Sequence, residues 1–267
     1  MALHPDVIRS RTNPALKRVG AVVAGKERGL LLLEGARLVG DARAAGLEFE
    51  LLLLAEDDPG GREWAERLGE RTEVRLVEQE LLERVSALEK SPGILALVRA
   101  PARRELRDLE GTFAGGDRAL VLVVAGVSDP GNLGALARSA EAAGATAMVL
   151  IAGTVSPWNS KALRGSMGSL LRLPILHAES AEEAAAEFVL RNMRQAIAAT
   201  RGGKGLREFD WSGALALWVT GETGVAPAVS TRLEPITIAM AGEAESLNVT
   251  VAGSLLLFAA GRAEKQA

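Results

Sequence analysis

Short apolar runs alternate with segments of helical character along nearly the whole chain, and this alternation restricts the fold more than any other feature. In the N-terminal part, the runs at residues 29–35, 48–55, 73–77 and 93–99 have the length and composition of strands. Helices are expected between them, over residues 36–45, 61–68 and 78–88. Strands and helices in this order predict a small α/β sandwich.

A second alternating series follows. Residues 119–125 read Ala-Leu-Val-Leu-Val-Val-Ala, a continuous apolar run that is typical of a strand buried on both faces of a parallel sheet. Further strands are expected over 147–151, 196–200 and 214–219, and helices over 132–143, 182–193 and 247–260. This order predicts an open, mostly parallel α/β sheet. We therefore expect two domains, residues 1–103 and 117–267, joined by a charged, Gly- and Pro-containing linker over 104–116.

Composition excludes several classes of function. The chain has no Cys and only two His, which argues against disulfides, thiolate nucleophiles, Cys-ligated or multi-His metal sites and a His-centred catalytic triad. The formal net charge is −3, so a surface for nucleic acid would have to be a local patch. Residues 1–46 offer one, with eight basic and four acidic side chains. Because no signal-peptide pattern or membrane-length apolar stretch is present, we expect a cytoplasmic protein.

Three polar, Gly-containing stretches lie at junctions between the expected strands and helices. The first, residues 129–140, begins Asp-Pro-Gly-Asn at a helix N-terminus, where free backbone N–H groups attract anions. Taken alone, Asn132 is typical of a helix cap and Arg138 of a solvated or ion-paired side chain. The second stretch, residues 156–169, places Lys161 and Arg164 one turn apart, where they could hold phosphate or simply belong to a short packed helix.

The third stretch combines Thr220-Gly221-Glu222-Thr223-Gly224 with residues 236–252 before the apolar terminal helix. Ser246 suits a helix N-cap, whereas Asn248, if buried, needs hydrogen-bond partners. Neither the G-x-G-x-x-G fingerprint nor a G-x-x-x-x-G-K-[ST] loop is present. The pattern therefore disfavours a nicotinamide-dependent enzyme or a nucleoside triphosphatase.

In this order, the three stretches resemble the signature motifs of the SpoU, or TrmH-like, family of SPOUT RNA 2′-O-ribose methyltransferases, over about residues 119–262. Asn132 and Arg138 match the Asn and catalytic Arg of the first motif, and Glu222 matches the Glu of the second. Ser246-Leu247-Asn248-Val249 matches the third motif, and the preceding Ile238-Ala239-Met240 has Ala where the family has Pro. Residues 13–17 and 33–37 resemble the ribosomal-protein-like substrate-binding domain of the rRNA-directed branch.

The resemblance implies a C-terminal α/β domain with a trefoil knot, a homodimer, and S-adenosyl-L-methionine as the cofactor. The implied function is 2′-O-methylation of a ribose in RNA during rRNA processing, with 23S rRNA favoured because of the long N-terminal domain. Alternatives are a tRNA 2′-O-methyltransferase and a non-catalytic RNA-binding or ribosome-assembly protein of the same fold. No metal is required.

The implied site residues fall into three groups. Catalytic residues would be Arg138, Asn132, Glu222, Ser246 and Asn248; cofactor-binding residues would be Thr220, Gly221, Ile238, Met240 and Leu247; RNA contacts are expected from Arg9, Arg11, Lys17, Arg18, Arg37, Lys161 and Arg164. A guanidinium, with a pKa above about 12, is a poor base. We therefore expect Arg138 to grip the ribose or phosphate and stabilise the developing alkoxide, while the proton leaves through phosphate or water.

Overall fold

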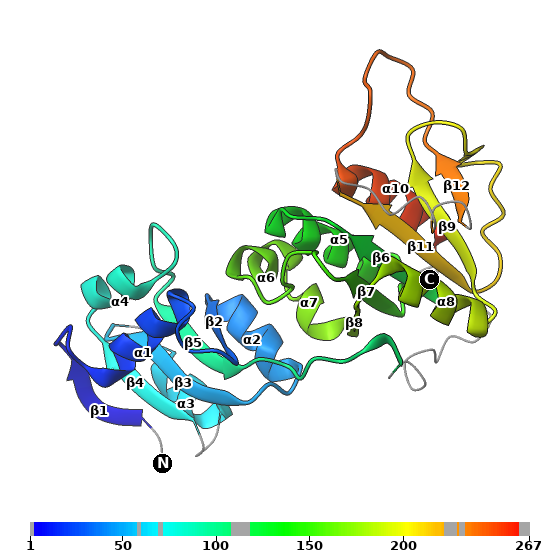
Figure 1. Ribbon diagram of the computed structural model, residues 1–267. Coiled ribbons are helices and arrows are strands. Elements are labelled where there is room, and N and C mark those ends of the chain that lie inside the picture. Colours follow the sequence, from blue (N-terminus) through cyan, green and yellow to red (C-terminus); the bar gives the residue numbers. More distant parts are fainter. Residues whose placement is uncertain are drawn as a thin grey trace, which may run out of the picture. The chain divides into compact units, whose positions relative to one another are not determined.

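The structure, a computed structural model, describes residues 3–57, 60–68, 72–107, 118–221, 229 and 233–261 (Figure 1). The chain divides into two compact units, Met1–Ala102 and Arg103–Ala267, here called the N-terminal and C-terminal units. The first residues of the expected linker differ from expectation: Leu106 is fully buried in the core of the C-terminal unit, and His177 N donates to Arg104 O. Residues 108–116 of that linker lie outside the described residues.

The N-terminal unit is built on a mixed sheet. Its strands are β1 (Leu3–Ile8), β2 (Leu30–Glu34), β3 (Phe49–Ala55), β4 (Glu73–Val77) and β5 (Ile94–Arg99), in the order β1-β4-β3-β5-β2. The central strand β3 is parallel to β4 and antiparallel to β5. The four expected strands are confirmed as β2 to β5, whereas the edge strand β1 was missed because its polar residues hide the apolar alternation.

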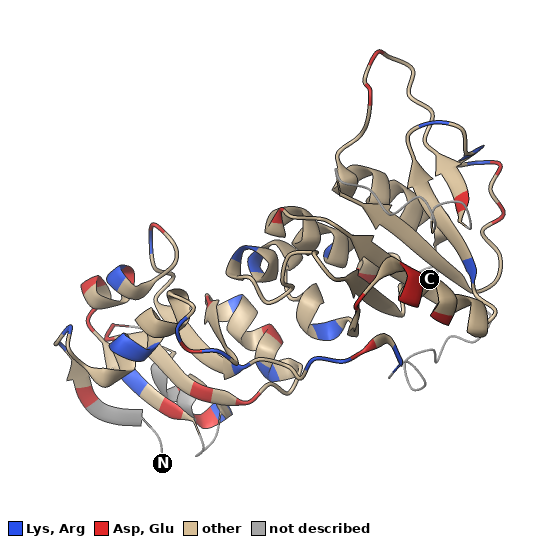
Figure 2. Ribbon diagram, viewed as in Figure 1, with Lys and Arg blue, Asp and Glu red and all other residues tan. Residues whose placement is uncertain are grey.

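Helices of the N-terminal unit carry many of its basic residues. They are α1 (Pro14–Val23), α2 (Ala36–Ala44), α3 (Gly61–Leu68) and α4 (Gln79–Val85). Helix α1 begins where Asn13 Oδ1 accepts the Ala15 N–H at 2.9 Å, with Pro14 at the first helical position. Leu16 and Val19 of α1 pack on the core beneath the sheet. Lys and Arg positions of α1 and α2 therefore remain at the surface (Figure 2).

The C-terminal unit contains a wholly parallel sheet. Its strands are β6 (Leu120–Ala125), β7 (Ala147–Ile151), β8 (Ile175–Ala178), β9 (Arg194–Ala199), β10 (Lys204–Gly205), β11 (Leu215–Thr220) and β12 (Glu234–Thr237), in the order β10-β12-β9-β11-β6-β7-β8. Every paired strand runs parallel to its neighbour. All six residues of β6 are buried, which confirms that this apolar run lies within a parallel sheet. The short strands β8, β10 and β12 were not expected.

Helices cover both faces of this sheet: α5 (Pro130–Ala142), α6 (Ser160–Ser166), α7 (Ser169–Arg172), α8 (Ala181–Leu190) and α10 (Val249–Ala260). Phe188 of α8 packs edge to face on Trp218 of β11 on one face. On the opposite face α10 lies against α5 and β11, and a Cβ at Gly253 would come within 2.6 Å of Leu136. Within the described residues, no helix has the length and apolar character that a membrane crossing needs.

Candidate active site

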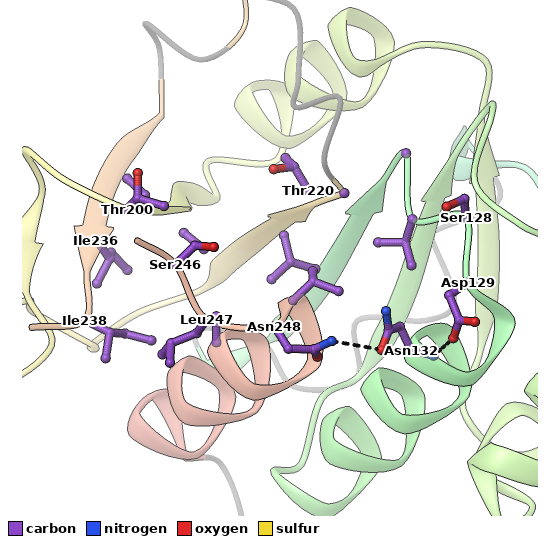
Figure 3. A pocket seen from close by; sticks show the side chains of 18 of the residues that line it. Ser128, Asp129, Asn132, Thr200, Thr220, Ile236, Ile238, Ser246, Leu247 and Asn248 are labelled. Carbon is purple, nitrogen blue, oxygen red and sulfur yellow. Dashed lines mark hydrogen bonds between the residues drawn. The ribbon is translucent and has the colours of Figure 1, made fainter. Parts of the chain in front are cut away.

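A pocket of about 530 Å³ opens at the carboxyl ends of the adjacent parallel strands β12, β9, β11 and β6. The residues that close it follow directly from those strands, and α5 and the segment before α10 complete the wall (Figure 3). Open α/β sheets bind ligands at this edge because the loops and helix N-termini converge there. The volume suits a small organic cofactor.

Asp129 forms the corner of the pocket where β6 passes into α5. Its Oδ1 caps α5 by accepting the Asn132 N–H at 2.8 Å, and its Oδ2 pairs with Lys161 Nζ at 2.8 Å. The Lys161 ammonium, followed by the Asn132 N–H, lowers the pKa of Asp129 below its ordinary value. The helix cap that Asn132 taken alone suggested is instead supplied by Asp129. Asn132 lies in the first turn, and it lines the pocket.

The first turns of α5 and α10 meet through side-chain amides. Asn248 caps α10, with its Oδ1 accepting the Thr250 N–H at 2.8 Å and its Nδ2 donating to Asn132 Oδ1 at 3.3 Å. Asn248 thus has the hydrogen-bond partners expected of it. Ser246 is not the N-cap that the sequence suggested, because α10 begins at Val249 and its N-cap is Asn248, which accepts the Thr250 N–H. Ser246 lines the pocket instead.

All five residues expected to hold the cofactor line this pocket: Thr220, Gly221, Ile238, Met240 and Leu247. Gly221 is sterically required, because a Cβ there would lie 2.0 Å from the carbonyl oxygen of Gly126 on the neighbouring strand end. Asn132, Ser246 and Asn248 also reach the pocket. Glu222 lies outside the described residues.

Arg138 does not join them. It lies six residues beyond Asn132, which at about 100° per residue turns it about 120° around α5, and its side chain is exposed. The next residue, Ser139, faces α10, since its Oγ lies 2.7 Å from Ser254 Oγ. The structure thus separates the two residues that the first motif supplies.

Two strand ends were missed from the sequence. Ala198, Ala199 and Thr200 at the end of β9, and Gly126, Val127 and Ser128 after β6, also line the pocket. Their position was available in principle, since they close strands that were expected and parallel strands end at a common edge. The strand order could not be read from the sequence. It places β11 between β9 and β6, so the ends of these three strands lie side by side although β6 and β9 are far apart in the chain.

Some of the residues expected to contact RNA form ion pairs with acidic side chains, and others do not. Arg9 pairs with Glu56 and Glu78, and Arg18 pairs with Glu27 and Glu50, which raise the pKa of Arg18. Arg11, Lys17 and Arg37 are exposed and have no acidic partner within the part of the chain that the structure describes. Arg164 is half-buried in α6, and Lys161 is held by Asp129.

The chemistry of the pocket fits S-adenosylmethionine. Ile236, Ile238 and Leu247 provide an apolar surface for an adenine ring, and the strand ends expose backbone groups that can bind its edge. Among the residues that the structure describes, no cluster of three or more His, Asp or Glu could hold a metal ion.

A parallel α/β sheet with a cofactor-sized pocket at its strand ends defines an α/β enzyme that binds a small organic cofactor there. The SpoU rRNA Methylase family model matches residues 119–258, and the MRM3-like substrate binding domain model matches residues 13–96. The chain belongs to the SpoU rRNA methylase family.

Relatives and a solved structure agree with this assignment. The chain is 30% identical over 265 residues to the 23S rRNA (adenosine(1067)-2'-O)-methyltransferase of Streptomyces laurentii, which covers 94% of each chain. It is 36% identical over 146 residues to the mitochondrial rRNA methyltransferase 3B of Danio rerio, covering 55% of this chain and 32% of that longer one. The AdoMet-bound rRNA methyltransferase from Sinorhizobium meliloti shares the fold, with a TM-score of 0.82 at 24% identity over 96% of this chain and 97% of that one.

Proposed function

We propose that the protein transfers the methyl group of S-adenosylmethionine to the 2′-hydroxyl of a ribose in 23S rRNA. The observation that carries this proposal is the convergence of Asn132, Asn248 and the expected cofactor residues on one pocket at the strand ends. Membership of the SpoU family and the 23S rRNA named for the Streptomyces laurentii relative support it. A cytoplasmic location accompanies a ribosomal RNA substrate.

The chain's own residues bind and orient the reactants. When bound, S-adenosylmethionine supplies a methyl group on a sulfonium, which is electrophilic without a metal. Ile238, Met240 and Leu247 cover the cofactor and exclude water, and Asn132 and Asn248 present amide groups at the open side of the pocket. This arrangement aligns the 2′-oxygen, methyl carbon and sulfur for in-line displacement.

Arg138 acts as a charge, not as a base. Its guanidinium binds the phosphate or ribose of the target nucleotide and stabilises the alkoxide as the 2′-proton leaves through phosphate or water. Glu222 fixes the loop after β11 or orients Arg138, and Ser246 contacts the target nucleotide. The N-terminal unit supplies RNA phosphate contacts through Arg11, Lys17 and Arg37, supported by Arg9 and Arg18. Lys161 and Arg164 of α6 add contacts from the C-terminal unit.

The protein acts as a homodimer through α10. Val251, Leu255 and Phe258 are spaced along one side of this helix and are 47%, 43% and 59% exposed, so the helix presents an apolar stripe to solvent. Arg138 is exposed and precedes Ser139, which contacts Ser254 of the same helix, and on this basis we place Arg138 near the stripe. A dimer through the stripe therefore brings Arg138 to the contact, within reach of the partner's pocket. The trefoil knot of the C-terminal unit is part of the same proposal.

The dimer is tested by mixing two inactive variants. Arg138→Ala and Asn132→Asp would each inactivate a pocket, and co-expression produces mixed dimers in which one pocket has both intact groups. Recovery of up to about half the wild-type activity per mixed dimer supports an arginine supplied by the partner. No recovery would show that Arg138 serves the pocket of its own chain.

The reaction is tested by transfer of tritium from labelled S-adenosylmethionine to unmodified 23S rRNA, 16S rRNA and bulk tRNA, followed by nucleoside analysis. We expect a labelled 2′-O-methylnucleoside from 23S rRNA alone. Label in tRNA would replace the substrate with tRNA. Cofactor binding without transfer to any naked RNA or ribosomal subunit would leave a non-catalytic RNA-binding protein.

A further inference from the structure

Thr250 lies in the first turn of α10 and does not line the pocket, but its hydroxyl contacts Asn132, which does. The Thr250 Oγ1 lies 3.2 Å from both the backbone oxygen and Oδ1 of Asn132. Thr250 and Asn132 are 118 positions apart, so this contact exists only because α10 packs on α5.

One backbone donor determines which way two amides face. The Thr250 N–H can only donate, so the Asn248 atom that faces it at 2.8 Å is Oδ1. The opposite end of that amide, Nδ2, then faces Asn132 at 3.3 Å, and the atom that meets this donor must be Asn132 Oδ1. The Asn132 Nδ2, with its two N–H donors, is therefore turned away from Asn248 and toward the pocket (Figure 3).

The Thr250 hydroxyl completes this arrangement. Without it, Asn132 Oδ1 would keep only the 3.3 Å contact with Asn248, and the amide could rotate about its side-chain bonds. We infer that Thr250 is a positioning residue that holds the Asn132 amide with its N–H donors in the pocket, where they bind an oxygen of the target nucleotide. The inference rests on the proposed function, because it takes RNA as the ligand of that amide.

Ser254 offers a matched control on the same helix. Its Oγ lies 2.7 Å from Ser139 Oγ, so it also links α10 to α5 by one side-chain hydrogen bond. Neither serine lines the pocket. A loss of packing between the helices alone should therefore affect the Ser254→Ala and Thr250→Val proteins alike.

Kinetics separate the two roles. Thr250→Val removes the hydroxyl and keeps the branched shape, and we expect kcat to fall about tenfold because Asn132 is misplaced, while KM for S-adenosylmethionine changes less than about twofold. Thr250→Ser should restore most of kcat. Ser254→Ala should lower the midpoint of thermal unfolding as much as Thr250→Val does and leave kcat unchanged. Equal kcat in Thr250→Val and wild type would overturn the inference, as would an equal loss in Ser254→Ala.

A readout that needs no turnover distinguishes this inference from the proposed function. In protein labelled with ¹⁵N-asparagine, the Asn132 side-chain NH₂ signal is assigned by its loss in Asn132→Asp. We expect it to shift in Thr250→Val but not in Ser254→Ala, and to shift again when an RNA fragment is added to wild type. If the wild type methylates no RNA but the signal still responds to Thr250→Val, the proposed function fails and the positioning role stands. An Asn132 signal that ignores both Thr250→Val and RNA would contradict the inference.

Discussion

The two units are both α/β structures, but they differ in sheet topology and in how their polar side chains are used. The N-terminal unit has a mixed sheet, and several of its arginines are bound to glutamates across neighbouring elements, as in the pairs Arg9–Glu56 and Arg18–Glu27. The C-terminal unit has a wholly parallel sheet whose strand ends leave polar backbone groups and amides around a pocket. Under the proposed function, methyl transfer would depend on the geometry of the C-terminal pocket, and RNA binding would depend mainly on the few uncompensated charges of the N-terminal unit.

Arg138→Ala should reduce activity more than any other substitution considered. A loss of RNA binding in this variant would contradict the assignment of RNA binding mainly to the N-terminal unit. If the guanidinium stabilises charge that develops during transfer, as proposed, kcat should fall about 100- to 1000-fold with little change in RNA affinity. Arg138→Lys should retain measurable turnover. Single-turnover methyl transfer, with RNA binding measured separately, checks both; a lysine variant as inactive as the alanine variant would show that charge alone is insufficient.

Gly221→Ala should weaken binding of S-adenosylmethionine and leave RNA affinity unchanged. The new Cβ would lie 2.0 Å from the Gly126 oxygen, and the forced backbone shift costs about 3 kcal/mol, roughly a hundredfold in cofactor affinity. Gly242→Ala is the control, because nothing lies within 4 Å of a Cβ at that position. Calorimetric titration with S-adenosylmethionine measures both, and equal affinities would show that this strand end is not part of the cofactor site.

Neutralising the unpaired basic side chains of the N-terminal unit should weaken RNA binding without affecting methyl transfer. Combining Arg11→Gln, Lys17→Gln and Arg37→Gln should raise KM for RNA about tenfold, reduce the slope of log affinity against log salt by about 2, and leave kcat unchanged. Arg18→Gln should have a smaller effect, because Glu27 and Glu50 already compensate that charge. RNA affinity over a series of salt concentrations tests this, and equal losses in both proteins would remove the distinction between free and paired arginines.

The smallest effect concerns stability of the C-terminal unit. Arg172 Nε and Nη2 lie 2.6 and 2.9 Å from the Glu141 carboxylate, and this contact lowers the pKa of Glu141 below its ordinary value of 4.5. A depressed carboxylate pKa stabilises the fold above the unfolded-state value, and that stability is lost as the pH falls through the lower folded value. Arg172→Met should lower the free energy of unfolding by less than about 1 kcal/mol at pH 7, because both groups are partly exposed. Urea unfolding at pH 7 and at acid pH should show the difference shrinking below about pH 4.5; a difference independent of pH would assign it to packing.

Much of the architecture was predictable because it follows from local patterns of apolar and polar residues. A wholly apolar run such as residues 119–125 can only be buried on both faces, and the structure confirms it as β6. Weak local patterns failed: the polar β1 and the four-residue β8 and β12 carry too few alternating positions to be recognised.

The site divides in the same way. Residue types and their order along the chain pointed to Gly221, Asn132 and Asn248, since a close backbone approach needs Gly and a polar side chain at a helix start needs a role. Their roles came from packing: Asp129 and not Asn132 caps α5, and Asn248 and not Ser246 caps α10. Helix starts shift by two or three residues at little local cost, so a single sequence does not decide between neighbouring cap residues.

Only the tertiary structure brings Asn132 to Asn248 and Thr250, and only it gathers the ends of separate parallel strands around the pocket that Asn132 lines. The chain alone determined that strands would be buried, that glycines would permit close contacts and that these polar residues would need partners. Which partners they obtain depends on strand order and on the packing of α10 against α5, and that packing joins residues more than a hundred positions apart, as in the 116 positions from Asn132 to Asn248. Local propensity acts over a few residues, so it cannot encode that choice.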